Sequence, residues 1–210
     1  MSSSLTYLIT GANRGIGKGL TSTLLQRPNT TVVAAVRDVS KSTPTLESLS
    51  KASGSKLIIV KLDSSSESDP KDAVAQLQSE HGITSLDIVV ANAGIMHSGT
   101  SIANTSTSAL RDHFAVNTIG PILLFQAVKP LLQASKSGNP IYIAISTAIG
   151  SMGIQGHLAA LPPTFSPYGV SKAALNWAVV RIHFEEPWLT AYAVHPGVVT
   201  TDMGLSLIHI

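Results

Sequence analysis

The sequence predicts an α/β protein in which a mostly parallel, doubly wound sheet lies between two layers of helices. The first observation is that short apolar runs alternate with segments of helical periodicity along the 210 residues. The second is that most of these runs are apolar at successive positions, as in strands that are buried on both faces. With right-handed crossovers between parallel strands, this pattern indicates a three-layer α/β/α sandwich.

Six strands are expected, each a short run rich in Val, Ile, Leu or Thr and bounded by polar or glycine-rich residues. They cover residues 5–9, 31–36, 57–62, 86–90, 141–145 and 189–194. Between them, a first helix begins near Ile16 and ends at residues 27–29, where Pro28 stops it. A weakly periodic segment around Leu46 and Leu49 follows the second strand.

Three further helices are expected over residues 67–81, 107–132 and 168–186. The second of these contains Gly120-Pro121, and the missing N–H of the proline predicts a kink there. A loop rich in Gly, Pro and Ser covers residues 148–167. No linker or repeat divides the chain, so residues 1–203 are expected to form a single domain.

Composition excludes several classes of function. There are no cysteines, and the seven histidines are dispersed, so neither a disulfide scaffold nor a metal site is expected. The net charge is +2 and the basic residues are scattered, which argues against nucleic-acid binding. No apolar run approaches the length of a membrane span, and the N-terminus lacks a basic export region. A cytoplasmic protein is therefore expected.

The chain is organised around the turn Thr10–Gly17, which lies between the first strand and the first helix. At the start of a helix, N–H groups without intrahelical partners and the positive end of the dipole favour a phosphate group. Glycines at 11, 15 and 17 allow unusual dihedral angles and close approach of a pyrophosphate. The turn therefore predicts a Rossmann-type dinucleotide site.

The other strands also end in polar or glycine-rich residues. These are Arg37, Asp63, Asn92-Ala93-Gly94, Ser146-Thr147 and His195-Pro196-Gly197. Because ligands of open α/β sheets bind beyond the carboxyl ends of the strands, these residues outline one site. Met96 and His97 follow the Asn-Ala-Gly turn, and both substrate contact and plain loop packing remain open for them.

Tyr168 and Lys172 are the pair most suggestive of catalysis. Four residues along a helix place both side chains on one face. An ammonium near the phenol favours phenolate and is expected to lower the tyrosine pKa toward neutrality. Tyr168 could then exchange a proton with an alcohol or carbonyl oxygen.

These motifs resemble those of the short-chain dehydrogenase/reductase family, over residues 5 to about 203. The resemblance implies that Tyr168 is the general acid/base, that Lys172 binds the nicotinamide ribose, and that Asn117 holds a proton-relay water. Asp63 resembles the residue that meets the adenine ring, and residues 196–201 resemble the segment that touches the nicotinamide carboxamide. The positions assigned to the cofactor are Thr10, Gly11, Asn13, Arg14, Gly15, Ile16, Gly17, Arg37, Asp63, Asn92, Ala93, Gly94, Tyr168, Lys172, Pro196, Gly197, Val199 and Thr201.

The end of the second strand favours NADP(H) over NAD(H). Members that prefer NAD place an acidic residue there, whereas this chain has Val36 followed by Arg37. A guanidinium suits a 2′-phosphate, and Arg14 could reach the same group. Asp38 is a complication, because its carboxylate could pair with Arg37.

One catalytic position departs from the family pattern. The family usually has Ser-Ser after the fifth strand, and the alignment of residues 145–148 puts Thr147 at the second serine, which polarises the substrate oxygen. A threonine hydroxyl can donate the same hydrogen bond. Ser146 takes this role if the alignment is off by one. The separation between Thr147 and Tyr168 exceeds the usual one, which predicts an enlarged loop at the substrate site.

The expected function is an NADP-dependent reductase that transfers hydride to a ketone or aldehyde, with Tyr168 as proton donor. Residues 5–95 also resemble fungal ketoreductases of polyketide pathways, of the norsolorinic acid ketoreductase type, and more distantly sniffer-type carbonyl reductases. The alternative is a non-catalytic NADP-binding or redox-sensing protein of the same fold. The partner is a small-molecule carbonyl or alcohol, and formation of a homo-oligomer remains open.

The last residues depart from the resemblance. Family members continue past Thr201-Asp202-Met203 with a loop, a helix and a seventh strand, whereas residues 204–210 resemble no family segment. We expect this tail to be a truncation or read-through product. The sixth strand is then expected to be an apolar edge that invites pairing with other chains.

Overall fold

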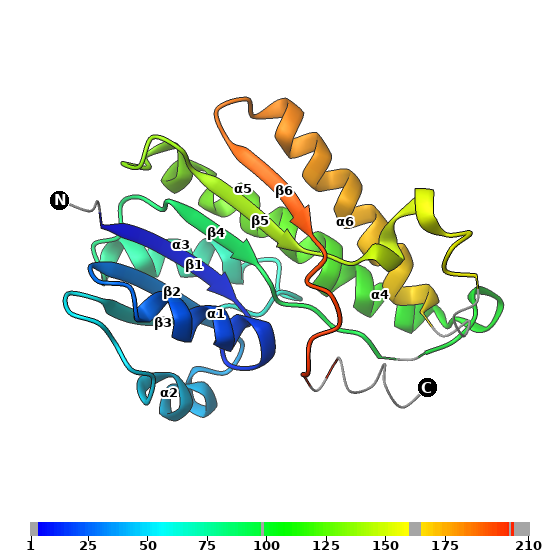
Figure 1. Cartoon of the computed structure of the whole chain (residues 1–210), viewed down its shortest axis with the longest axis horizontal. Helices are drawn as coiled ribbons and strands as arrows, with labels where there is room; N and C mark the ends of the chain where they lie inside the picture. Colours follow the sequence, from blue (N-terminus) through cyan, green and yellow to red (C-terminus); the bar gives the residue numbers. More distant parts are fainter. Residues whose placement is uncertain (1–3, 98, 160–164, 202, 204–210) are drawn as a thin grey trace.

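The computed structural model describes residues 4–97, 99–159, 165–201 and 203, and it confirms the predicted fold class. A six-stranded sheet has the order β3-β2-β1-β4-β5-β6, and every neighbouring pair is parallel (Figure 1). The strands are β1 (Leu5–Thr10), β2 (Thr30–Val36), β3 (Lys56–Lys61), β4 (Ile88–Ala91), β5 (Ile141–Ile145) and β6 (Thr190–Val194). Their bounds lie within two residues of the predicted ones.

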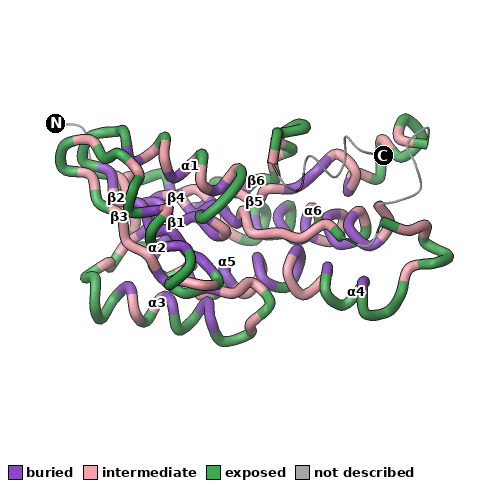
Figure 2. Tube along the Cα trace, turned by 90° about the horizontal axis from the view of Figure 1, so that it is seen from below, coloured by how far each residue is buried: buried purple, intermediate pink, exposed green. Residues whose placement is uncertain are grey.

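Helices lie on both sides of the sheet. They are α1 (Gly15–Leu25), α2 (Val39–Glu47), α3 (Asp69–Ser79), α4 (Thr107–Phe114), α5 (Gly120–Gln133) and α6 (Ser166–Glu185). Figure 2 shows α1 on one face and α3, α4 and α5 on the other. Leu25 of α1 and Leu46 of α2 belong to a core cluster with Val32, whereas Leu124 of α5 and Leu175 of α6 pack in a second cluster with Leu8.

The helix predicted over residues 107–132 is built differently from the expectation. Between α4 and α5 the chain makes a π-helical turn, η2 (Ala115–Ile119), which ends one residue before Gly120-Pro121. Pro121 lies in the first turn of α5, where a missing N–H costs nothing. A Cβ atom on Gly120 would lie 2.3 Å from the carbonyl oxygen of Ser64, so this glycine permits the close approach. π-turns are frequent at functional sites, and this one carries Asn117.

The stretch Thr107–Gln133 is also long and apolar enough to span a membrane by length and composition, with a mean hydropathy of 1.3. Half of its apolar 18-residue window is buried inside the fold, where Leu124, Val128 and Leu132 belong to the core. We therefore interpret it as a core helix.

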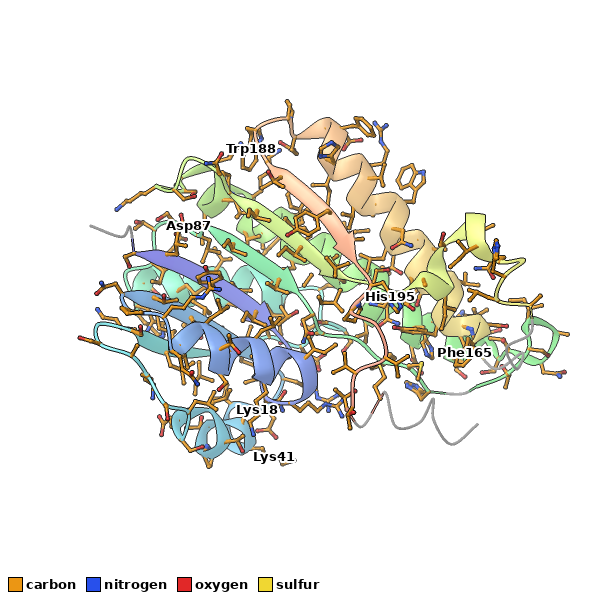
Figure 3. All side chains as sticks on the ribbon, viewed as in Figure 1. Lys18, Lys41, Asp87, Phe165, Trp188 and His195 are labelled. Carbon is orange, nitrogen blue, oxygen red and sulfur yellow. The ribbon has the colours of Figure 1, made fainter. Side chains whose placement is uncertain are left out.

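Parallel crossovers bring all the carboxyl ends of the strands to one edge of the sheet. In Figure 3, Asp87 and Trp188 lie at the amino ends of β4 and β6, and His195 lies at the opposite edge, just after β6. The amino edge is fixed by Asp87, whose carboxylate accepts hydrogen bonds from the backbone N–H of Thr6 at 2.8 Å and the hydroxyl of Ser135 at 2.6 Å. The carboxyl edge carries the predicted site residues.

Candidate active site

The glycine turn between β1 and α1 has the conformation that the motif predicts. Gly11 and Gly15 have φ angles of +64° and +51°, which residues with a Cβ atom rarely adopt. A Cβ atom on Gly17 would lie 2.3 Å from the carbonyl oxygen of Gly11 and 2.6 Å from Nδ2 of Asn92. The backbone of the turn and the start of α1 are therefore in contact, and only glycine fits there.

Thr10 and Asn92 lock this turn to the end of β4. The Thr10 hydroxyl oxygen accepts hydrogen bonds from the N–H groups of Asn92 and Ala93, both at 3.0 Å. The Asn92 side chain donates from Nδ2 to the carbonyl oxygens of Thr10 at 2.8 Å and Gly11 at 3.3 Å. Thr10 is only 2% exposed, so its hydroxyl supports the turn from within the protein.

The adjacent face of the turn is open. Asn13, Arg14 and Gly15 are exposed, and Ile16 is half-buried. Arg14 precedes α1 with an extended backbone, and its side chain does not cap the helix. Because a guanidinium cannot accept a hydrogen bond, the Arg14 side chain leaves the first N–H groups of α1 to other acceptors, such as the oxygens of a phosphate. This cradle of glycines and a helix amino terminus fits a pyrophosphate.

Arg37 and Asp38 follow β2 and take separate roles. Arg37 is exposed. The Asp38 carboxylate caps α2, because it accepts from the N–H of Lys41 at 3.1 Å and the hydroxyl of Ser40 at 2.8 Å, and it pairs with the Lys41 ammonium. These bonds, that of the Lys41 N–H first, lower the pKa of Asp38. The sequence raised the possibility that Asp38 pairs with Arg37, but in the structure the Asp38 carboxylate is bonded to residues of α2.

Asp63, after β3, is half-buried and held from two sides. Its carboxylate accepts hydrogen bonds from the N–H and the hydroxyl of Ser65, at 2.9 and 2.7 Å. Its own N–H donates to the buried carboxylate of Asp69 at 2.8 Å, and Asp69 also pairs with Lys61. Asp69 therefore fixes the loop that carries Asp63, a role that sequence reasoning missed.

Tyr168 and Lys172 lie one turn apart on α6, as predicted, with the Lys172 ammonium 5.8 Å from the centre of the tyrosine ring. Both are buried, and Lys172 donates from Nζ to the carbonyl oxygen of Ile145 at 2.7 Å. Burial lowers the pKa of Lys172 to about 8 and raises the pKa of Tyr168 to about 12. The tyrosine shift is opposite to the expectation, because the desolvation of the ring outweighs the charge of an ammonium that is bonded to β5.

The hydroxyl groups of Ser146 and Thr147, at the end of β5, make different hydrogen bonds. The Ser146 hydroxyl donates to Oδ1 of Asn176 at 2.5 Å, while Asn176 donates from Nδ2 to the carbonyl oxygen of Gly150 at 3.2 Å. The Thr147 hydroxyl oxygen accepts from the N–H of Ile149 at 3.2 Å, so its proton can still be donated. Asn176, which sequence reasoning missed, binds Ser146 to α6.

Asn117 is fully buried in the π-turn and joins three elements. Its Oδ1 accepts from the N–H of Ile95 at 2.9 Å, and its Nδ2 donates to the carbonyl oxygen of Ile95 at 2.9 Å and to the hydroxyl of Ser171 at 3.0 Å. Ser171 in turn donates to the carbonyl oxygen of Tyr168 at 2.7 Å. The side-chain amide of Asn117 therefore links the loop after β4 to the turn of α6 that carries Tyr168.

The segment after β6 folds back across the sheet edge toward the glycine turn. Gly197 has a φ angle of +77°, and a Cβ atom on Gly15 would lie 3.2 Å from Cγ2 of Thr201. Pro196 and Thr201 are half-buried, and Val199 is exposed. All the predicted site residues thus lie along one edge of the sheet. The tail 204–210 lies outside the described residues.

Comparison with known proteins agrees with this geometry. The family model for short chain dehydrogenases matches residues 6–208. Norsolorinic acid ketoreductase of Aspergillus parasiticus is 46% identical over 198 residues, which cover 94% of this chain and 72% of the relative. Norsolorinic acid ketoreductase of Dothistroma septosporum is 42% identical, covering 95% of this chain and 74% of the relative.

Solved structures show the same fold. NADPH-bound carbonyl reductase from chicken fatty liver superposes with a TM-score of 0.78 and 31% identity, covering 95% of this chain and 81% of that protein. The protein is therefore an oxidoreductase that acts on carbonyl or hydroxyl groups of a small molecule, with a nicotinamide cofactor. It belongs to the short chain dehydrogenase family and, within that family, is similar to the norsolorinic acid ketoreductases.

Proposed function

We propose that the protein is an NADP-dependent ketoreductase that transfers hydride between NADPH and a ketone or aldehyde, with Tyr168 as general acid/base. The observation that carries this proposal is the arrangement at the end of β5. There Lys172 is bonded to Ile145 beneath the Tyr168 ring, and Thr147 follows two residues later in the chain. A proton donor, a cation and a hydroxyl group thus lie at one edge of the sheet.

The residues present fit a dinucleotide. The glycine cradle at Gly11 and Gly17 would hold the pyrophosphate, the loop at Asp63 would face the adenine, and Asn92, Ala93 and Gly94 would line the ribose. When bound, the nicotinamide ring supplies the hydride. Arg37 is exposed, and the Asp38 carboxylate next to it caps α2, which supports a preference for the 2′-phosphate of NADP.

The raised pKa of Tyr168 decides which form of its side chain is present at neutral pH. A phenol with a pKa of about 12 keeps its proton at neutral pH, so Tyr168 is set to donate that proton to a carbonyl oxygen. The buried Lys172 ammonium then stabilises the phenolate that forms. A hydrogen bond from the Thr147 hydroxyl polarises the same oxygen, while the Ser146 proton is already donated to Asn176.

The substrate proposed is bulky and apolar, of the polyketide secondary-metabolite kind. An apolar groove of about 520 Å³ lies against Gly169 and Val170 of α6, next to Tyr168 in the chain, although Tyr168 itself is not part of its lining. Its lining includes Ile149, Met152, Leu158, Phe165 and Val170. The loop after β5, predicted to be enlarged, supplies much of this surface. The names of the relatives from Aspergillus parasiticus and Dothistroma septosporum point to the same substrate class.

A carbonyl screen tests the proposal. Purified protein is incubated with NADPH and a panel of aromatic polyketide ketones, small ketones and aldehydes, and the loss of NADPH absorbance is followed. Turnover with an aromatic ketone supports the proposal. Binding of NADPH without turnover on any carbonyl would instead favour the non-catalytic NADP-binding or redox-sensing alternative.

The same assay distinguishes the two hydroxyl groups after β5. Thr147→Ala is expected to lower kcat by roughly a hundredfold, because it removes the donor to the substrate oxygen, and Thr147→Ser should restore most of it. Ser146→Ala loses only its bond to Asn176 and should cost less than about tenfold. Equal losses in the two alanine variants would reject Thr147 as the polarising group.

A further inference from the structure

The segment that follows β4 is held by two side chains of one helical stretch. Asn117 bonds both backbone groups of Ile95, as described above. One turn earlier, Nε2 of His113 lies 3.4 Å from the backbone N of His97, and the two imidazole rings are 4.8 Å apart. His113 and Asn117 therefore hold alternate residues of the segment 94–97. The proposed function gives no role to His113.

The bonds of His113 define its tautomer. Its Nδ1 lies 2.7 Å from the carbonyl oxygen of Ala109, which can only accept, so Nδ1 carries the proton. Nε2 then has a lone pair and accepts from the His97 N–H. His113 is fully buried, and burial lowers its pKa from the ordinary 6.5. The charges that act on it are His97, across the ring contact, and Asp112, on its own helix. At neutral pH the ring is therefore neutral and able to accept.

The held segment touches the proposed catalytic groups. A Cβ atom on Gly94 would lie 3.2 Å from Oδ1 of Asn117 and 3.7 Å from Nζ of Lys172. Movement of the segment would therefore change the space beside the lysine.

We propose that His113 is a positioning residue, whose neutral imidazole holds the backbone at His97 and so fixes the segment 94–97 beside Lys172. This inference rests on the proposed function for its effect on catalysis. Protonation of the ring would place an N–H on Nε2 opposite the N–H of His97. The bond would be lost, and the segment would be released as the pH falls. Substrate binding should then weaken at acid pH.

Three variants separate this role from general packing. His113→Leu removes the acceptor and keeps an apolar group of similar volume. His113→Gln keeps an acceptor oxygen at similar reach and cannot titrate. His97→Ala removes the partner ring and its charge but keeps the backbone N–H and the His113 acceptor, so it is the matched control.

Backbone amide exchange, followed by NMR, tests the contact without any need for activity. The His97 N–H should exchange roughly tenfold faster in His113→Leu than in the wild type, and it should stay protected in His113→Gln and His97→Ala. The Ile95 N–H, bonded to Asn117, should stay protected in all three and so reports that the fold is intact. An unchanged exchange rate at His97 in His113→Leu would overturn the proposal.

Kinetics then test the effect on the site. With a substrate found in the carbonyl screen, His113→Leu should raise KM by roughly five- to tenfold with little change in kcat, and His113→Gln should restore most of the loss. Because burial lowers the pKa of His113 below 6.5, wild type and His97→Ala should lose kcat/KM on acidification below about pH 6.5, whereas His113→Gln should not lose it in that range. The same acid limb in His113→Gln would contradict the proposal. If the wild type reduces no carbonyl, the proposed function fails and amide exchange alone decides the role of His113.

Discussion

Strand β2 and helix α6 bury very different residues. In β2, six of the seven residues are buried, and five of these are the apolar run Val32–Val36. In α6, the buried residues include Tyr168, Ser171 and Lys172, which are respectively 9%, 0% and 3% exposed. Strand β2, on the side that would hold the adenosine, thus buries an apolar run. Helix α6, on the side that would hold the carbonyl, buries hydroxyl groups and the lysine side chain.

The positions of β2 and β6 in the sheet differ as well. β2 lies between β1 and β3, whereas β6 is the last strand in the order and, among the residues that the structure describes, pairs only with β5. No described helix is drawn in front of β5 and β6 in Figure 1, and Tyr192 of β6 is 41% exposed. A cavity of about 560 Å³ runs along β6 and α6. Because α6 buries the Lys172 side chain and hydroxyl groups, we expect this helix to give up stability for chemistry.

The largest expected effect on cofactor binding is at the glycine turn of the adenosine half. Gly17→Ala would place a methyl group 2.3 Å from the carbonyl oxygen of Gly11, so the turn must move apart from α1. NADPH affinity, measured by fluorescence titration, should fall by at least roughly a hundredfold. Gly19→Ala is the matched control in the same helix, because nothing lies within 4 Å of its added methyl group. That variant should bind normally and gain about 0.5–1 kcal/mol of stability. Normal binding in Gly17→Ala would refute the cradle.

In the carbonyl half, a substitution that destroys activity should stabilise the fold. The pKa of Lys172 is about 8, below its ordinary 10.5, because burial disfavours the ammonium. Below about pH 8 the folded protein therefore carries a buried charge that lowers its stability. Between about pH 8 and 10.5 the folded form is neutral while the unfolded form still binds the proton, so stability rises with pH.

Lys172→Met should consequently raise the free energy of unfolding at pH 7, on the order of 1–2 kcal/mol after loss of the bond to Ile145, while abolishing most turnover. The gain should shrink toward pH 10. Urea unfolding measures both quantities, and Lys71→Met, at an exposed position of α3, should change stability by less than about 0.5 kcal/mol. A Lys172→Met protein that is less stable than wild type at pH 7 would show that the buried charge carries no cost.

The two halves also differed in how far they could be predicted. The strands, the glycine cradle and the Tyr168/Lys172 pair were accessible because their signals are local: apolar runs, three glycines and a spacing of four. The supporting residues were not accessible. Ser171, the partner of the predicted Asn117, lies 54 positions away from it, and Asn176 lies 30 positions from the predicted Ser146, so no sequence spacing identifies these two partners. The raised pKa of Tyr168 was missed because burial is a property of the packed fold.

A smaller effect is expected at the cofactor's 2′-phosphate. Arg37→Ala should weaken NADPH binding by roughly tenfold, the loss of one charge-assisted contact, and leave NADH binding unchanged. Fluorescence titration with both reduced cofactors measures the difference. Lys41→Ala, whose ammonium already pairs with Asp38, should weaken NADPH less than Arg37→Ala does. Equal or tighter binding of NADH by the wild-type protein would contradict NADP preference.

The smallest expected effect concerns the edge of the sheet. Tyr192→Lys places a charge on the exposed edge strand, which should disfavour pairing with other chains. Light scattering should show less self-association at high concentration, with kcat within about twofold of wild type. Unchanged association would mean that β6 is not the surface through which chains meet.

The central claim is that Tyr168 donates the proton to a carbonyl, and Tyr168→Phe tests it most directly. The substitution keeps the ring packing and removes only the hydroxyl group. NADPH binding and NADPH-dependent turnover are measured on the same preparation, with the aromatic ketone from the screen as substrate. We predict binding within about threefold of wild type and turnover lower by roughly a hundred- to ten-thousandfold. Near-normal turnover in Tyr168→Phe would contradict the assignment.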